Sequence, residues 1–576
     1  MNQTRVILLV AIAVVGFLLV QKWEADFAPA PLSPAAVTSP STAEVGDSSV
    51  PEAPVTAVTD NAIPAAPQAV EIPAVEATPA AGSAAPAAET VLIETDTLRL
   101  VLSTRGATIQ STELLKFPIS LDRPQELVRL FSTDPTHWHV PQAGLVSAGQ
   151  RTPTHDELYT TAQREWRLES GRELLEVPFE WRDGERVVRK IYRFERGSYT
   201  VGVRFDVVNG STEAWPVAAY RQLQRVIPPR ADSGFFLSNP ETYAYIGAAM
   251  WSPTGAFEKL PFDDYQSAPL NRPGVSGGWA AMLQHHFTTA WLPPAGESVT
   301  FSTRALPATG NLAPRYMVTL MGPVQSLAPG ASSSFEQRLY VGPKEQNRMA
   351  EVAPGFDLAV DYGFFTFLSK PMFWVMDWLH GLVGNWGMAI ILLTLLVRLA
   401  MYKLSEAQYR SAAKMKKLQP KLLALQERYA DDRQQLALKQ MELFKQEKAN
   451  PMSGCLPVLL QIPVFIALYW VIFESVELRQ APFILWIKDL TAPDPYFVLP
   501  ILNGIVMYVT TKLSPTPVSD PVQKMVFQIL PVVFSVLFAF FPAGLVLYWT
   551  ANGAIGLAQQ LWITKRIENE DHRHKR

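Results

Sequence analysis

The sequence predicts a polytopic α-helical membrane protein with six spans and a large exported all-β domain. Three observations support this prediction. One apolar segment lies near the amino terminus and five follow residue 385, and each approaches the length that a helix needs to cross a bilayer. Between them, roughly 250 residues alternate apolar and polar side chains in the manner of strands. Lysine and arginine gather in the connections that would share one side of the membrane.

The amino-terminal segment predicts a membrane anchor over residues 1–27. Val6–Val20 is a run of fifteen apolar residues, and Arg5 precedes it. A segment of this length suits either a cleaved signal peptide or a short anchor. Ala28-Pro29-Ala30 resembles a cleavage site, but its proline and the acidic residues nearby weaken the match. We therefore favour an uncleaved anchor, with a signal peptide as the alternative.

Residues 28–88 predict a disordered spacer. They contain eleven prolines among alanine, valine, serine and threonine. Such a segment cannot bury enough apolar surface to fold. No lysine or arginine occurs between Lys22 and Arg99. This lack of positive charge is typical of an exported segment.

Residues 89–345 predict one large antiparallel β-sandwich. The stretch has no long helical period, and apolar residues alternate with other residues in short runs. The clearest run has its alternate positions at Tyr199, Val201, Val203, Phe205 and Val207. His137, His139 and the His285-His286 pair lack acidic or cysteine partners at fixed spacing, so no metal site is expected.

Residues 354–383 predict an amphipathic helix that lies in the membrane interface. The segment is rich in phenylalanine and tryptophan, carries a few charges and ends where an apolar span begins. Pro371 is expected to break this helix, because proline lacks the N–H that continues the hydrogen-bond ladder. The alternative is a helix that packs against the β domain.

A core of five spans is predicted over 386–564, at about 386–402, 455–473, 496–512, 525–541 and 543–563. The connection 403–448 holds eleven lysines and arginines against six acidic residues, and the tail 565–576 adds five more. The connection 474–495 holds only Arg479 and Lys488 against four acidic residues. The positive-inside rule therefore places both termini and the first connection in the cytoplasm, with the β domain outside.

The cytoplasmic stretch 404–448 predicts two antiparallel helices. Apolar residues fall on one helical face at Leu422, Leu425, Tyr429 and Leu436, followed by Met441 and Phe444. Asp431 and Asp432 can cap the second helix. The chain's net charge is −3, so this excess of positive charge is a local feature. Two explanations stay open: a solvated structural hairpin, or docking on lipid headgroups, ribosomal RNA or an acidic partner.

Arg398 is the one charged residue in the interior of the five spans. A charge near the middle of a spanning helix costs roughly 2.5–3.5 kcal/mol on insertion scales, so it usually faces protein or water and usually has a function. The alternative is that Arg398 snorkels toward the membrane surface, because Lys403 lies only about 7.5 Å further along a helix.

Uncharged polar residues recur in every span, at Thr394, Gln461, Asn503, Gln528, Tyr548 and Asn552. Each could simply join two helices by a hydrogen bond of about 0.6 kcal/mol. Their recurrence together with an arginine favours a shared wet cavity. The interiors of the spans contain no aspartate, glutamate or histidine. The absence of such groups disfavours an ion-coupled transporter and a membrane protease, since both need titratable side chains in the membrane. No cofactor is expected.

Four segments carry a resemblance to a known family. They are VRLAMYKLSEAQYRSAAKMKKLQPK, NPMSGCLPVLLQIPVFIALYW, VELRQAPFILWIKDL and FPAGLVLYW. With them the chain resembles the YidC family of membrane protein insertases, in the long form of Gram-negative inner membranes. The resemblance implies an uncleaved anchor, a periplasmic β-supersandwich and a five-helix insertase core with a hydrophilic groove. It also implies that the protein inserts nascent inner-membrane proteins and helps them fold, without catalysis.

The resemblance assigns roles to individual residues. Arg398 matches the groove arginine of the family, and Thr394 matches its neighbour one turn away. Contacts to the substrate's span are implied for Ile462, Pro463, Phe465, Leu537 and Phe538. Trp549 departs from the family, because the best-known relatives carry a second tyrosine after the one that matches Tyr548. Trp549 still offers an N–H donor to the groove.

The implied partners are nascent membrane proteins, the Sec translocon, the ribosome and membrane lipids. Candidate ribosome or partner contacts are the basic residues Lys414, Lys416, Lys417, Lys421, Arg573, Lys575 and Arg576. Two other functions remain possible from the sequence. One is a channel or transporter with an exported domain, and the other is an envelope-assembly scaffold that acts through its β domain.

Overall fold

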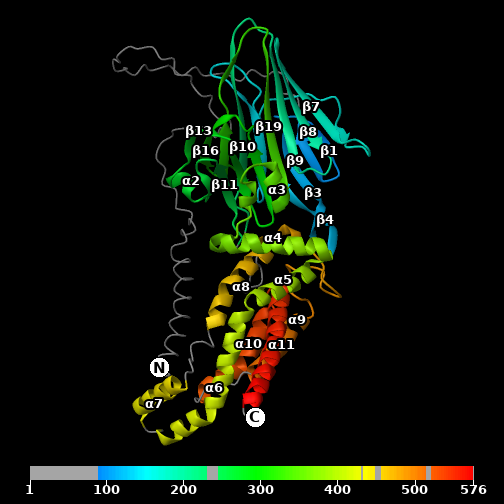
Figure 1. The fold of residues 1–576 in the computed structure, drawn as a ribbon. Helices are drawn as coiled ribbons and strands as arrows, with labels where there is room; N and C mark the ends of the chain where they lie inside the picture. Colours follow the sequence, from blue (N-terminus) through cyan, green and yellow to red (C-terminus); the bar gives the residue numbers. More distant parts are fainter. Residues whose placement is uncertain (1–87, 230–243, 430–431, 448–455, 514–520, 575–576) are drawn as a thin grey trace, which may run out of the picture. The chain divides into compact units, whose positions relative to one another are not determined.

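A computed structural model describes residues 88–229, 244–429, 432–447, 456–513 and 521–574. These residues form two compact units, a β unit that ends at Ala359 and a helical unit that begins at Val360 (Figure 1). The predicted anchor 1–27 and nearly all of the predicted spacer 28–88 lie outside the described residues.

The described strands of the β unit form three sheets of five, six and eight strands. The first has the order β4-β3-β2-β1-β6, with bounds β1 Thr90–Glu94, β2 Leu98–Ser103, β3 Thr108–Ser120, β4 Arg123–Phe131 and β6 Glu165–Arg167. The second has the order β13-β16-β17-β10-β18, and β5 also pairs with β10, with bounds β5 His139–Val146, β10 Trp215–Val226, β13 Asn271–Ser276, β16 Ser298–Leu306, β17 Arg315–Met321 and β18 Gln325–Leu327. The third has the order β12-β11-β14-β15-β19-β9-β8-β7, with bounds β7 Leu174–Asp183, β8 Arg186–Glu195, β9 Thr200–Asn209, β11 Gly247–Ser252, β12 Ala256–Leu260, β14 Trp279–Leu283, β15 Phe287–Leu292 and β19 Ser332–Pro343.

Alternation builds the core of the β unit. In β9 the side chains of Val201, Val203, Phe205 and Val207 are all buried, so the alternation predicted for this run is confirmed. The six- and eight-stranded sheets contact each other through β10 and β15, where the Trp291 indole donates to the Gln222 carbonyl at 3.0 Å. The strand pairs are antiparallel as predicted, apart from the parallel pair β1 and β6. Two short helices, α2 (Asp264–Ser267) and α3 (Gln346–Val352), complete the unit.

The segment predicted as one interfacial helix over 354–383 is divided in the structure. Two short 3₁₀ turns, η2 (Phe356–Ala359) and η3 (Gly363–Phe365), precede the helix α4 (Thr366–Val383). The expected break at Pro371 is wrong, since α4 continues through that residue. Pro371 lies in the second turn, where its missing N–H removes one hydrogen bond. Packing of the following turns offsets this loss.

The helix α4 has one buried face and one exposed aromatic face. Its buried residues are Ser369, Met372, Phe373, Met376 and Leu379. The Ser369 hydroxyl donates to the carbonyl of Ala467 at 3.1 Å, which fixes α4 on α8 (Leu456–Glu474). Phe367, Trp374 and Trp378 are 71%, 69% and 57% exposed. The helix is therefore amphipathic, as the sequence predicts.

The remaining helices of the helical unit are α5 (Trp386–Ala400), α6 (Tyr402–Arg428), α7 (Arg433–Gln446), the 3₁₀ turn η5 (Val476–Leu478), α9 (Val498–Leu513), α10 (Pro521–Phe538) and α11 (Ala543–His574). Helix α11 packs against α5, α6, α8 and α9 (Figure 1). Among the described residues no single helix is both long and apolar enough to cross a membrane by length and composition alone. The bent pair Trp386–Ala400 and Tyr402–Met415, with an angle of 65°, meets the same test together.

Side chains define where two of these helices begin. The Asn385 side chain accepts from the Met388 N–H at 3.0 Å and donates to the Phe483 carbonyl at 2.9 Å, so it caps α5 and fixes the loop before α9. The buried Asp494 carboxylate accepts from the Leu499 N–H at 2.8 Å and from the Trp486 indole at 2.9 Å. This carboxylate fixes the first turn of α9.

The predicted helical hairpin consists of α6 and α7. Asp432 caps α7 as predicted, because its carboxylate accepts from the N–H groups of Gln434 and Gln435 at 3.1 and 3.0 Å. Asp431 lies outside the described residues. The contact between the helices is made by Met415, Leu418, Leu422, Leu443 and Phe444. The prediction that Met441 lies on this apolar face was wrong, since its side chain is 56% exposed. A contact between only two helices is narrow, and it includes Leu443 and Phe444 but not Met441.

Candidate functional site in the helical unit

The centre of the candidate site is the contact between Arg398 on α5 and Asn552 on α11. The Arg398 Nε donates to the Asn552 side-chain oxygen at 2.7 Å, and Nη2 donates to the Asn552 carbonyl at 2.9 Å. Both bonds use a charged donor, which makes them stronger than neutral hydrogen bonds. The guanidinium is therefore directed at α11, and this contact disfavours a side chain that snorkels toward Lys403.

Two residues that the sequence analysis missed complete the surroundings of Arg398. Gly556 lies one turn after Asn552 on α11, and a Cβ built there would be 2.9 Å from Arg398 Nη2. The hydroxyl of Tyr409, on α6, donates to the Gly556 carbonyl at 3.0 Å. The spacing of Asn552 and Gly556 is a signal that the sequence offers, because residues four apart share a helix face. Nothing in the sequence marks Tyr409.

Arg398 keeps its positive charge uncompensated in the part of the chain that the structure describes. Its two hydrogen bonds go to an amide oxygen and a peptide carbonyl, which are both neutral. No carboxylate among the described residues lies within ion-pair distance of its guanidinium. The last turn of α5 also favours a cation, because the helix dipole is negative at that end.

A second polar contact joins α8 to α11. The Gln461 side-chain amide donates to the Tyr548 hydroxyl at 2.5 Å. Tyr548 lies one turn before Asn552 and is almost fully buried. Gln461, Tyr548, Asn552 and Arg398 thus form one polar stripe across three helices. The structure brings these four predicted residues together.

The other predicted polar residues are separate from this stripe. The buried Thr394 hydroxyl donates to the Ile390 carbonyl of its own helix at 2.7 Å. Asn503 is buried on α9, where its amide contacts the Met507 sulfur at 3.6 Å and its oxygen has no hydrogen-bond partner among the described residues. Gln528 is exposed on α10. None of these three residues has a described hydrogen bond to Arg398, Asn552 or Tyr548.

An aromatic cluster lies next to the polar stripe. The Trp549 ring is 4.6 Å from Phe465 on α8 and 5.5 Å from Phe538 on α10, measured between centroids. Trp549 thus fills the position of the family's second tyrosine with an aromatic packing surface. Phe538 is buried, whereas Ile462 is 46% exposed. Pro463, Phe465 and Leu537 are half-buried, so Ile462 is the most accessible of the predicted substrate contacts.

The candidate partner residues of the hairpin have mixed surroundings. Lys414 and Lys417 are exposed on α6, and Lys421 pairs with Glu447 at 2.6 Å. Lys416 and Arg573 belong to described helices, but their side chains lie outside what the structure describes. Lys575 and Arg576 are outside the described residues. The pair between Lys421 and Glu447 is exposed and worth at most about 1 kcal/mol.

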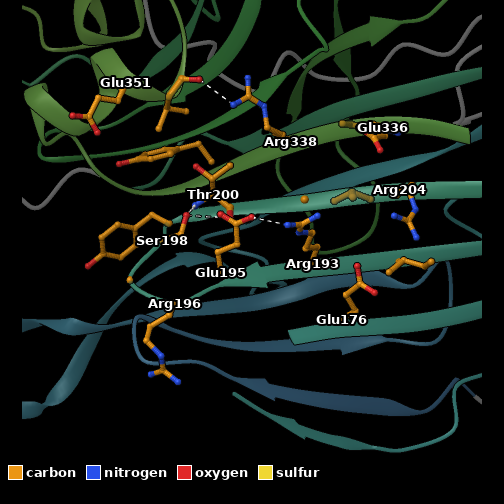
Figure 2. Close-up of a pocket in the computed structure, with 18 of the residues that line it drawn as sticks. Glu176, Arg193, Glu195, Arg196, Ser198, Thr200, Arg204, Glu336, Arg338 and Glu351 are labelled. Atoms are coloured by element: carbon orange, nitrogen blue, oxygen red, sulfur yellow. Dashed lines mark hydrogen bonds and ion pairs between the residues drawn. The ribbon is translucent and has the colours of Figure 1, made fainter. Parts of the chain in front are cut away.

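The β unit contains a separate hollow of about 660 Å³ on the outer face of its eight-stranded sheet (Figure 2). Its arginines are satisfied by neighbours: Arg193 pairs with Glu195 at 3.1 Å, and Arg338 donates to the Val352 carbonyl at 3.0 Å. Charges that are already paired within the sheet attract a charged ligand weakly. The hollow therefore carries less functional weight than the Arg398 stripe.

Buried titratable groups inside the β unit are structural. The Lys190 ammonium donates to the carbonyls of Gly106 and Ala143 at 2.8 and 3.1 Å, and its burial lowers its pKa to about 7. The His155 ring lies 2.5 Å from the Tyr220 hydroxyl, and burial lowers its pKa to about 4. Burial in the folded unit thus destabilises the charged form of both groups. They make its stability depend on pH.

The chain matches two protein families and several curated relatives over most of its length. Residues 378–570 match the family described as "60Kd inner membrane protein", and residues 90–375 match the family described as "YidC periplasmic domain". The membrane protein insertase YidC of Thioalkalivibrio sulfidiphilus is 42% identical over 580 residues, which cover 99% of each chain. That of Nitrosococcus oceani is 42% identical over 572 residues, 99% of this chain and 100% of the other. A crystal structure of an active YidC insertase with its first transmembrane domain resolved has 19% identity and a TM-score of 0.38, and covers 82% of this chain and 92% of that one.

The two family models together match residues 90–375 and 378–570, and they define an inner-membrane protein with a periplasmic domain. The chain belongs to the YidC family of membrane protein insertases. The predicted family and insertase function are thereby confirmed, and the family is not a class of enzymes.

Proposed function

We propose that the polar stripe of Arg398, Asn552, Tyr548 and Gln461 is the surface that receives the polar end of a nascent membrane protein. Backbone groups that enter a bilayer without partners cost several kcal/mol each, so a hydrophilic surface at this depth lowers the cost of passage. The partly exposed side chains of Arg398 and Gln461 offer donors and an acceptor to an extended chain, and the buried Asn552 and Tyr548 hold them in place. Arg398 adds attraction for acidic residues.

One observation supports this proposal more than any other. Arg398 is fixed by two hydrogen bonds to neutral oxygens of Asn552, and no described carboxylate neutralises it. A structural arginine inside a helical unit would normally pair with an acid to offset its cost. A fixed and unpaired cation is suited to attracting an anionic ligand that arrives later.

The driving forces need no nucleotide or cofactor. With a potential that is negative inside, outward movement of each acidic charge gains about 2.3 kcal/mol per 100 mV. The substrate's apolar segment would move along α8 and α10, past Ile462 and Leu537, into lipid. Partitioning of that segment into hydrocarbon supplies the remaining free energy.

We further propose that the helical unit lies in a bacterial inner membrane and that the protein has six spans, counting the anchor 1–27. Helices α5, α8, α9, α10 and α11 would be the five spans of the core, with both termini in the cytoplasm. The exposed tryptophans of α4 support a position for this helix in the membrane interface, where such side chains are enriched. The basic hairpin would face the cytoplasm and contact the ribosome or anionic lipid, and the Sec translocon is a further proposed partner.

Substitutions of Arg398 test the proposed role. Arg398→Lys keeps the charge and should retain much activity, whereas Arg398→Ala should reduce insertion of substrates with acidic translocated segments and affect neutral ones least. Insertion of two substrates that differ only in their acidic residues is measured in vesicles, with the level of each variant as the control. If Arg398→Ala and the natural protein insert both substrates equally well, the charge has no role in the groove.

A further inference from the structure

Gly556 leaves room for the Arg398 guanidinium. A Cβ at this position would lie 2.9 Å from Nη2, 3.2 Å from Cζ and 3.4 Å from Nη1 of Arg398. These atoms are at the free end of a flexible side chain, so an added methyl group would displace Arg398 rather than separate α5 from α11. Any larger residue at position 556 is therefore expected to break the contact between Arg398 and Asn552.

Tyr409 contacts the same point of α11 from the hairpin. Its hydroxyl donates to the Gly556 carbonyl at 3.0 Å. Tyr409 belongs to α6, which begins at Tyr402 immediately after the bend that ends α5. A second contact joins the same two helices, because the rings of Tyr402 on α6 and Trp562 on α11 pack with their centroids 6.1 Å apart. The base of the hairpin is thus attached to α11 at the turn that holds Arg398.

We propose that Gly556 and Tyr409 are positioning residues that hold the Arg398 guanidinium in the groove and couple it to the position of the hairpin. The inference rests on the proposed function of Arg398. When Tyr409 leaves Gly556, the turn of α11 that carries Asn552 and Gly556 loses its hydrogen bond to α6. Arg398 then loses part of its orientation. The hairpin's docked position and the reception of acidic substrates are therefore linked, and by thermodynamic reciprocity each favours the other.

Gly556→Ala tests the first part of the inference. The full-length protein is reconstituted in vesicles, and insertion is measured for the substrate pair that differs only in acidic residues. The ratio of acidic to neutral insertion should fall about tenfold, which corresponds to about 1.4 kcal/mol and is close to the lower end of the range for one hydrogen bond to a charged group. Gly553→Ala is the matched control, because its Cβ would meet Val506 of α9 at 2.9 Å and leave Arg398 untouched. Equal ratios for the two variants would overturn the role of Gly556.

A double substitution separates positioning from damage to the helix. In Arg398→Lys the guanidinium is absent, so Gly556→Ala should have no further effect on the ratio. A further fall of the same size in the double variant would mean that Gly556→Ala harms α11 itself, and the inference would be wrong. If Arg398→Ala leaves the ratio unchanged, the proposed function fails. If Arg398→Ala lowers it and Gly556→Ala does not, only this inference fails.

Tyr409→Phe tests the coupling to the hairpin. The variant removes the hydroxyl and keeps the ring, and Tyr402→Phe is the control because its ring packs on Trp562 without a described hydroxyl bond. Distances between spin labels on α7 and α11 should broaden for Tyr409→Phe, and the insertion ratio should fall in the same variant. Unchanged distances, or a changed distance with an unchanged ratio, would contradict the coupling.

Discussion

Replacing Asn552 by aspartate changes the charge of the groove and leaves its shape nearly intact. The side-chain oxygen of Asn552 lies 2.7 Å from Arg398 Nε, so the new carboxylate would form an ion pair with the guanidinium in the same geometry. The net charge of the site falls from one to zero. Because the substitution replaces an NH₂ group by an oxygen, little repacking is required.

The expected size of the effect follows from Coulomb's law. Two unit charges about 4 Å apart attract by about 1 kcal/mol in water and by about 4 kcal/mol at an effective dielectric constant of 20. A groove that admits water lies near the lower value. Neutralising Arg398 should therefore reduce the preference for each acidic residue of a substrate about fivefold, since about 1.4 kcal/mol corresponds to a factor of ten.

The assay compares insertion of paired substrates by Asn552→Asp and by Asn552→Ala. The alanine variant removes only the hydrogen bond to Nε and keeps both the positive charge and the bond from Nη2 to the backbone carbonyl of residue 552, so it should lose less of the preference for acidic segments than the aspartate variant. The aspartate variant should lose it. If both variants lose the preference equally, the hydrogen bond matters and the net charge does not, and the electrostatic reasoning is refuted.

Three further predictions concern other parts of the chain. Deleting 404–448 should impair insertion while the protein stays in the membrane, and normal insertion by a well-expressed variant would reduce the hairpin to a topology signal. Deleting most of 100–330 but keeping Phe356–Val383 should preserve complementation, and failure despite stable expression would favour the scaffold alternative. Burial lowers the pKa of Lys190 to about 7, so between about pH 7 and pH 10 the unfolded state binds more protons than the folded state. The free energy of unfolding of the β unit should therefore rise with pH in that window, and Lys190→Met should flatten the rise. Urea unfolding at several pH values measures this dependence. The same slope against pH for both proteins would contradict the prediction.

The spacing of apolar residues predicted much of the architecture, because the burial of one face of a strand or helix imposes a regular spacing on residues that are close in the sequence. The alternation of β9 and the cap at Asp432 depend on residues close together in the sequence, and both are confirmed. Pro371 and Met441 were misjudged because tertiary packing decides whether a helix survives a proline and which residues form a narrow seam. Local signals do not carry that information.

The site was predicted in part for the same reason. Arg398 and Asn552 stand out as polar residues in apolar spans. The sequence therefore predicts each as a site residue, but it does not predict that the two are in contact. Tyr409 lies in a polar helix where a tyrosine is ordinary, and its contact with Gly556 spans 147 positions. Asn503 has the same polar character as Asn552 but packs on Met507. Composition identifies candidates, and only the packing of α11 selects among them.

The most direct test of the central claim is a crosslink between a stalled nascent chain and the stripe side of α8. A photoreactive residue replaces Ile462, which is 46% exposed beside Gln461, and in a separate variant it replaces Leu396, which is 43% exposed. Leu396 lies two residues before Arg398 and therefore on nearly the opposite side of α5. We predict a strong crosslink to the nascent chain from position 462 and little from position 396. Equal crosslinking from both positions, or crosslinking from 396 alone, would contradict the role of the stripe as the receiving surface.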